Sequence, residues 1–148
     1  MTLTFQNIEK QFAEIATIHA HSFERAWSEA ILQDMFRKGQ YSGTLILQND
    51  QVIGFIICAT VLDEAEIISI AISPEQRGKA FAAQLLNYEV KRLQNLSIKK
   101  LHLEVNQSNI AAIKLYQTTG FSQIAVRKNY YKLANGNRTD ALIFSLSL

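Results

Sequence analysis

A carboxylate and a phenol lie on two consecutive elements that the sequence predicts between residues 101 and 121. Apolar and polar residues alternate on either side of Glu104, which predicts a strand, and the helical spacing from Ile110 onward predicts a helix that carries Tyr116. Gly120 is a typical helix terminator. A carboxylate at a strand end can act as a general base, and a phenol as a general acid. Both are also ordinary features of α/β domains, so this pair alone leaves the function open.

A second candidate site is the loop 73–82, which lies between a predicted strand and a predicted helix. The loop contains a proline, two basic side chains and several small residues. Unpaired amides in the first turn of a helix favour anions, and small side chains allow a phosphate to approach the backbone. A phosphate-binding loop and a plain turn before a helix are both compatible with these residues on their own.

Hydrophobic periodicity predicts one order of elements along the chain. We expect a second helix that Ser28 caps and Gly39 ends. The order of strands and helices is typical of an α/β sandwich with a mixed sheet. The expected strands are 2–7, 44–48, 51–62, 66–72, 100–105, 121–133 and 140–146, and the other helices are 9–23, 81–93 and 110–118.

Composition and size restrict the class of protein. The chain has 148 residues, of which 48% are apolar, and a net charge of +2 at pH 7. This length fills one core, so we expect a single domain over residues 1–148. The small charge, without an aromatic-studded basic stripe, does not indicate nucleic-acid binding. The longest mostly apolar stretch, 52–62, is much shorter than the ~18 residues of a membrane helix. Because no secretory signal is visible at the N-terminus, we expect a cytoplasmic protein without a membrane partner.

The sequence does not predict metal or thiol chemistry. Cys58 is the only cysteine and lies in an apolar run, which favours a buried, unreactive thiol. His19 and His21 are two positions apart on a predicted helix and His102 is distant, a spacing that does not suit zinc. We therefore expect no metal ion in the site.

With this loop and the pair Glu104 and Tyr116, the chain resembles the GNAT superfamily of N-acetyltransferases that depend on acyl-coenzyme A (acyl-CoA). The pyrophosphate loop of that family reads Gln/Arg-x-x-Gly-x-Gly/Ala, and this chain has Arg-Gly-Lys-Ala-Phe-Ala at residues 77–82. Ala80 replaces the central glycine and adds a methyl group near the expected pyrophosphate. The resemblance covers nearly the whole chain and is closest to the RimI type, the bacterial ribosomal-protein alanine N-acetyltransferases. The block Asn-Tyr-Tyr at 129–131 is its most specific part.

The resemblance implies a fold, a co-substrate and a set of binding residues. The fold is of the α/β (α+β) class, with a mixed central β-sheet and helices on both faces, and the co-substrate is acetyl-CoA. A central strand would hold the pantetheine arm through main-chain hydrogen bonds, and one backbone N–H near its end would be an oxyanion donor. The residues implied to bind the cofactor are Ile70, Ala71, Ile72, Arg77, Gly78, Lys79, Ala80, Phe81, Ala82 and Asn109.

The resemblance also implies how the reaction proceeds. Glu104 would be the general base, directly or through one water, and Tyr116 would be the general acid that protonates the departing thiolate. An α-amine has a pKa of ~7.7 to 8.0 and a lysine ~10.4, so a modest base suffices for an α-amine. The known acceptor of this type of enzyme is the N-terminal alanine of a small-subunit ribosomal protein, followed by arginine. We therefore expect a protein N-terminus as the acceptor.

Trp27 and the hairpin with Tyr130 and Tyr131 border the acceptor side in this family. Strand alternation predicts that one of the two tyrosines points into the core and leaves the other for the acceptor groove. Four acidic residues are candidates either for contacts with a basic peptide or for solvated surface charges. They are Glu29, Asp34, Asp63 and Glu64.

Two alternative functions remain open. A GNAT enzyme that acetylates a small amine would share every cofactor residue and differ only in the acceptor groove. A non-catalytic CoA-binding module would not require both Glu104 and Tyr116, although the replacement of glycine by Ala80 is compatible with it. Turnover separates an enzyme from a binding module, and the acceptor separates the two kinds of enzyme.

Overall fold

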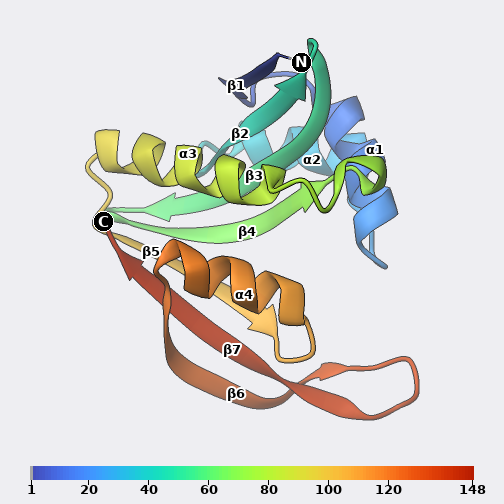
Figure 1. Ribbon diagram of the computed structural model, residues 1–148, viewed down its shortest axis with the longest axis vertical. Coiled ribbons are helices and arrows are strands. Elements are labelled where there is room, and N and C mark those ends of the chain that lie inside the picture. The colour runs from blue at the N-terminus through green and yellow to red at the C-terminus, as the bar shows by residue number, and fades with distance from the viewer. Residues whose placement is uncertain (1) are drawn as a thin grey trace.

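The structure, a computed structural model, describes residues 2–148 and has the predicted order of strands and helices (Figure 1). A 3-10 turn, η1 (Pro74–Gln76), lies between β4 and α3 and was not predicted. The strands are β1 (Leu3–Asn7), β2 (Tyr41–Gln48), β3 (Gln51–Val61), β4 (Glu64–Ile72), β5 (Lys100–Asn106), β6 (Ser122–Lys132) and β7 (Arg138–Ser147). The helices are α1 (Phe12–Ser22), α2 (Glu29–Arg37), α3 (Phe81–Asn95) and α4 (Ile110–Thr119).

Local chemistry explains where two of the helices begin and end. The Ser28 hydroxyl accepts a hydrogen bond from the Ile31 N–H and caps α2, as predicted. The Asn109 side chain accepts a hydrogen bond from the Ala112 N–H and caps α4. Gly120 ends α4 in the left-handed conformation, with φ 113°. These caps satisfy backbone groups that a helix leaves unpaired at its ends, so they fix where α2 begins and where α4 begins and ends.

The seven strands form one mixed sheet in the order β1-β2-β3-β4-β5-β7-β6. Neighbouring strands are antiparallel except β4 and β5, which are parallel. The parallel pairing joins only residues 64–66 of β4 to residues 100–102 of β5, and beyond it the two strands part (Figure 1). The rest of β4 therefore has no strand partner on the side of β5.

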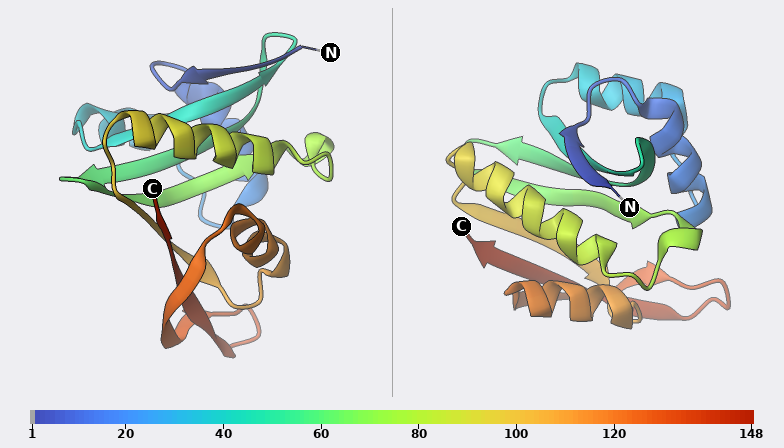
Figure 2. Two further views of the ribbon diagram at one scale, coloured as in Figure 1. Left: turned by 60° about the vertical axis from the view of Figure 1, so that its left-hand side comes forward. Right: turned by 45° about the horizontal axis from the view of Figure 1, so that its top comes forward.

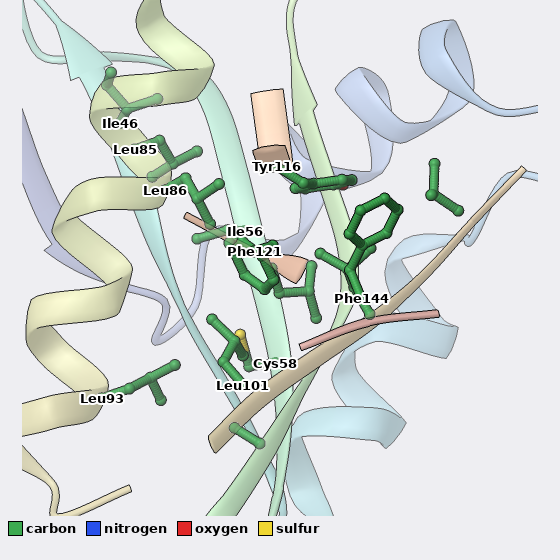
Figure 3. Close-up of a cluster of buried hydrophobic side chains, with 14 of the residues drawn as sticks. Ile46, Ile56, Cys58, Leu85, Leu86, Leu93, Leu101, Tyr116, Phe121 and Phe144 are labelled. Atoms are coloured by element: carbon green, nitrogen blue, oxygen red, sulfur yellow. The ribbon is translucent and has the colours of Figure 1, made fainter. Parts of the chain in front are cut away.

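Helices cover both faces of the sheet, which confirms the expected fold class (Figure 2). The helices α3 and α4 pack over a large core that includes Leu85, Leu101 and Phe144 (Figure 3). The helices α1 and α2 pack on the opposite face over a second core around Phe55 and Ile57. Because the apolar residues of β5 face the larger core, the polar residues between them face the other side of the sheet.

A buried polar cluster fixes α3 on the sheet. Glu89 of α3 is fully buried, accepts a hydrogen bond of 2.8 Å from the Thr44 hydroxyl, and pairs with Arg92 at 2.6 Å. Cys58 lies in the same core, and burial, with a contribution from Glu89, raises the pKa of its thiol well above the usual value. Cys58 is therefore a buried, protonated thiol, as predicted, because only the thiolate is a nucleophile.

Candidate active site

A cavity of about 780 Å³ opens where β4 and β5 part. Its walls come from β4, the second half of β5, α4, the first turn of α3 and the end of α1. A volume of this size is typical of sites for small molecules and cofactors. Many of the predicted site residues line this one cavity, among them Glu104, Tyr116, Ile70, Arg77 and Asn109.

Glu104 lies on β5 in the wall of the cavity, on the face of the sheet that is turned away from α3 and α4. Its side chain is 23% exposed, and Oε1 forms an ion pair of 3.1 Å with Nη1 of Arg127 on β6. Arg127 was not among the predicted site residues, because an arginine on an outer strand has no local pattern that distinguishes it from a solvated charge. A group bound in the cavity can reach the carboxylate, and in this structure the carboxylate already contacts a cation.

Tyr116 lies on α4 and is 6% exposed, with its ring edge-on to Phe121 at a centroid distance of 5.7 Å (Figure 3). It lines the same cavity as Glu104. Burial raises the pKa of Tyr116 to about 12, and the nearby Tyr131 adds to this effect. The phenol is therefore protonated near neutral pH and can donate a hydrogen bond to a group in the cavity.

The backbone amides of β4 point in two directions. Ser73 donates its N–H to the Ile53 carbonyl at 2.8 Å, towards β3. Because amides alternate along a strand, those of Ile72 and Ile70 point away from β3, into the gap beside β5, and that of Ala71 points towards β3. Of the strand residues 69–72 that were predicted to line the pantetheine arm, only Ile70 and Ile72 therefore have amides that face the cavity.

The loop before α3 offers backbone amides more than side chains. Ala80 is the N-cap residue of α3, has a left-handed conformation with φ 64°, and forms no side-chain cap. The first amides of α3 therefore have no acceptor within the helix. Gly78 also has a positive φ, 77°, and an added Cβ there would meet nothing within 4 Å. Free amides at a helix N-terminus, with open space beside Gly78 in the loop that leads to them, suit an anion such as a pyrophosphate.

Three larger side chains of this loop have other roles. Arg77 lines the cavity, but its guanidinium donates to the Ile72 carbonyl and to the Ser22 hydroxyl, each at 2.9 Å. Lys79 lies on the surface, and Phe81 is 4% exposed in the core under α3. Arg77 therefore ties the loop to the end of β4 and to α1, and only the backbone of Phe81 is available to a ligand.

A second hollow of about 620 Å³ adjoins the cavity between α3 and α4. The two share Ala80 and Ala83 on the side of α3 and Ala111 and Leu115 on α4, and Gly78 and Lys114 line the second hollow. Its walls are mostly small or polar, with one cationic side chain, and these properties suit a further part of a phosphorylated ligand. Lys114 was not among the predicted site residues, because a lysine on a helix is usually a solvated charge.

Trp27 lies between α1 and α2 and is anchored to His19. The rings stack with centroids 4.5 Å apart, and the backbone N–H of Trp27 donates a hydrogen bond to Nδ1 of His19 at 3.0 Å. His19 is 3% exposed, and burial lowers its pKa. A neutral imidazole can accept this hydrogen bond, whereas a protonated one cannot. The anchor lies next to Ser22 and Phe23, which line the cavity, so His19 positions the loop at that wall.

Tyr131 lines the cavity with Glu104 and Tyr116, whereas Tyr130 is 48% exposed. The Tyr130 and Tyr131 rings are edge to face, with centroids 5.1 Å apart. The prediction that one of these two tyrosines points into the core is wrong, since neither is buried. The pairing of β6 with β7 is irregular between Arg127 and Tyr131, so the strict alternation of a strand is lost there.

The four acidic residues considered as peptide contacts do not line the cavity. Asp63 and Glu64 lie at the end of β4 that is paired with β5, opposite the end where the strands part. Glu64 contacts His102 there at 3.1 Å, and Asp34 pairs on the surface of α2 with neighbouring basic residues. These side chains are surface charges of the kind that contribute little to stability.

Among residues 2–148, no group of three or more His, Cys, Asp or Glu side chains is placed to hold a metal ion. Within the same part of the chain, no helix combines the length and the apolar character that crossing a membrane requires.

Comparisons with known proteins agree on one family. The Acetyltransferase (GNAT) family matches residues 8–121. The ribosomal protein bS18-alanine N-acetyltransferase of Haemophilus ducreyi is 36% identical over 141 residues, which are 95% of this chain and 97% of that protein. The crystal structure of the ribosomal-protein-S18-alanine N-acetyltransferase from Escherichia coli has a TM-score of 0.88 and 31% identity, and the match covers 99% of this chain and 94% of that one. A phosphinothricin acetyltransferase from Sinorhizobium meliloti in complex with acetyl-CoA is similar in fold, with a TM-score of 0.87, 23% identity and coverage of 100% and 89%.

Proposed function

Since this chain belongs to the GNAT family of acetyltransferases, we propose that it transfers an acetyl group from acetyl-CoA to the N-terminal α-amine of a protein. Relatives that match over most of their length are named for ribosomal protein bS18 alanine, so we take an N-terminal alanine of that kind as the acceptor. The observation that carries the proposal is the single cavity at the divergence of β4 and β5, which Glu104 and Tyr116 both line.

The residues of the cavity fit acetyl-CoA. The free amides of Ile70 and Ile72 offer main-chain hydrogen bonds to an extended arm, in the manner of an added strand. The Ser69 hydroxyl, in the same wall, is the one buried side-chain polar atom of residues 2–148 without a hydrogen-bond partner. The first amides of α3 and Lys114 in the adjoining hollow suit the phosphates. When bound, acetyl-CoA supplies a thioester whose acetyl carbon is open to attack by an amine.

The chain's own residues then move protons and stabilise charge. Glu104 accepts the proton of the attacking amine, directly or through one water. As the new C–N bond forms and the C–S bond breaks, the amide of Ile70 or Ile72 donates to the carbonyl oxygen, where negative charge develops. The Tyr116 phenol donates a hydrogen bond to the departing sulfur. No covalent bond to the protein is needed, which agrees with the burial of Cys58.

The acceptor would approach from the side of Tyr131, an aromatic residue of β6 that lines the cavity together with Glu104. Tyr130 contacts Tyr131 edge to face without lining the cavity, and the resemblance to the family also puts the loop around Trp27 on the acceptor side. An α-amine with a pKa of ~7.7 to 8.0 is partly neutral at pH 7, so a carboxylate is a sufficient base for it, whereas a lysine at ~10.4 is almost entirely protonated. This difference favours a protein N-terminus over a lysine side chain.

The experiment that tests this function measures thiol release from acetyl-CoA together with the mass of the product. The purified protein is given a peptide that begins Ala-Arg, the same peptide with a blocked α-amine, and a panel of small amines. We expect a gain of one acetyl group on the free peptide alone. Turnover on a small amine but not on the peptide would replace the proposed acceptor, and cofactor binding without any turnover would indicate a binding module.

Glu104→Gln tests the base in the same assay. The amide keeps the shape of the side chain but accepts a proton far less readily, so we expect kcat to fall by roughly 10² to 10⁴. The affinity for acetyl-CoA should stay near the wild-type value, because the side chain acts on the amine. An equal loss of cofactor affinity would contradict the role of Glu104 as the base.

A further inference from the structure

Arg127 has no role in the mechanism described so far, although it is the residue that contacts the base. We propose that Arg127 occupies, in the acceptor-free enzyme, the cation site on Glu104 that the α-ammonium group of the acceptor takes on binding. This inference rests on the proposed function, because it concerns the same base and the same acceptor. Binding of the acceptor is then an exchange of one cation for another.

The contact between Arg127 and Glu104 crosses the sheet. Glu104 on β5 is in register with Ile143 of β7, and Arg127 on β6 is in register with Ala141 of β7. The arginine side chain therefore reaches over β7 to bring Nη1 within 3.1 Å of Glu104 Oε1. Ala141, the β7 residue in register with it, is buried and presents only a methyl group to this path. The ion pair thus spans the width of β7 and lies in the open wall of the cavity.

The guanidinium can leave Glu104 at little cost. The Arg127 side chain is 56% exposed, and exposed ion pairs of this kind are weak because water and salt screen them. Arg127 also has a second partner, since its guanidinium carbon lies 5.4 Å from the centroid of the Tyr130 ring. A cation over an aromatic ring is attracted to it, so the displaced side chain keeps a favourable position nearby.

The acceptor has the properties needed to displace it. An α-amine with a pKa of ~7.7 to 8.0 is mostly an ammonium ion at pH 7, so it arrives with the same charge as the guanidinium. The base must lie within hydrogen-bond reach of the proton that it removes, and the oxygen in question already holds a cation. A guanidinium cannot be deprotonated in proteins, whereas an ammonium ion can. Arg127 therefore occupies Glu104 without reacting, and only the acceptor brings a removable proton.

The test compares Arg127→Gln with the wild type, with a peptide that begins Ala-Arg as substrate and acetyl-CoA at saturation. We expect the peptide KM to fall about two- to fivefold while kcat stays near wild type, because a weak competitor for Glu104 has been removed. The same peptide without its α-amino group serves as an inhibitor that cannot compete for the carboxylate. Its inhibition constant should be the same for both proteins.

Two further variants control for charge and for packing. Lys128→Gln removes the same charge one position away and should leave the peptide KM unchanged. Arg127→Lys keeps a cation and should restore a KM near wild type. A lower kcat in Arg127→Gln at unchanged KM would show that Arg127 orients the base during catalysis and would overturn displacement. Unchanged kinetics, or an equal effect on both peptides, would also overturn it.

The wild-type control separates this inference from the proposed function. If the wild-type protein binds acetyl-CoA but acetylates no protein N-terminus, the proposed function fails, and the exchange of cations at its acceptor site fails with it. If the wild-type protein acetylates the peptide and only the Arg127 variants depart from expectation, the inference alone is overturned.

Discussion

The Tyr116 phenol is buried among aromatic rings but lines the cavity, and this environment decides how it can act. Burial raises the pKa of Tyr116 to about 12, whereas a free thiol has a pKa of ~8.5. Complete proton transfer from the phenol to a departing thiolate is therefore uphill. The environment favours donation of a hydrogen bond to the sulfur as negative charge develops on it. The general-acid role expected from the sequence is thereby restricted to hydrogen bonding, without complete transfer of the proton.

We expect Tyr116→Phe to lower kcat by roughly 10² because the donor to the sulfur is lost. The affinity for acetyl-CoA should change little. Because the protonated phenol is the donor and its pKa is about 12, the contribution of Tyr116 should persist up to roughly pH 11. Steady-state kinetics from pH 6 to pH 10 on both proteins would check this. A ratio of wild-type to variant kcat that falls with rising pH in that range would contradict it.

Ala80 is an alanine in a conformation that favours glycine, with φ 64° at the N-cap of α3. A left-handed conformation costs a residue with a Cβ about 1 to 2 kcal/mol, and part of this is offset because glycine is more flexible in the unfolded chain. Ala80→Gly should therefore raise the free energy of unfolding by up to about 1 kcal/mol. It should also strengthen binding of acetyl-CoA, since the methyl group lies beside the free amides. Urea unfolding and cofactor titration measure the two effects.

Ala82→Gly is the matched control for that substitution. Ala82 lies in the first turn of α3, where glycine lowers stability by roughly 0.5 to 1 kcal/mol. The two alanine-to-glycine changes should thus have opposite signs within three positions of the same loop. If both are destabilising, the left-handed conformation at Ala80 does not carry the expected strain.

At the scale of the elements, the sequence predicts what is local and misses what depends on distant partners. Strand alternation and helix caps predict β5 and α4, and so the order of Glu104 and Tyr116, because these signals lie within a few residues. The contact of Arg127 with Glu104 joins strands that are separated by β7, and no repeating pattern in the sequence predicts such a contact. The contacts of Arg77 could not be predicted from the sequence either, because its guanidinium donates hydrogen bonds to α1 and β4 instead of pointing at an anion.

The connection between α1 and α2 depends on one buried histidine. Nδ1 of His19 accepts a hydrogen bond from the backbone N–H of Trp27, and burial lowers the pKa of His19 from the ordinary value of 6.5. The unfolded chain therefore binds the proton more readily than the folded one. The contribution of the neutral His19 side chain to stability is fully present above pH 6.5. It is lost as the pH falls from 6.5 through the lower pKa that His19 has in the folded state.

His19→Gln should reduce this dependence on pH, because glutamine keeps a hydrogen-bond acceptor but does not titrate. Urea unfolding at pH 7.5 and pH 5.5 should show a larger loss of stability in the wild type than in the variant. Trp27 is the only tryptophan of the chain, so its fluorescence reports on the same loop during the experiment. An equal loss in both proteins would show that His19 is not the group responsible.

For the whole molecule, the site exists because the sheet is joined only at one end. The strands β1 to β4 and the strands β5 to β7 meet through the short pairing of residues 64–66 with 100–102 and through the core under α3 and α4. At the other end the cavity separates them. A ligand that hydrogen-bonds to β4 in this gap would take the place of the missing strand contacts and connect the two parts.

Amide hydrogen exchange can test this directly, residue by residue. The amides of Ile70 and Ile72 face the gap, and the amide of Ala71 faces β3, so the first two should exchange faster in the free protein. With CoA at about 100 times its Kd, exchange at Ile70 and Ile72 should slow by up to about 100-fold. Ala71 should slow less, because its hydrogen bond to β3 is present in both states. Equal slowing at all three positions would show general stabilisation of the fold, and no slowing at Ile70 and Ile72 would place the arm of the co-substrate elsewhere in the cavity.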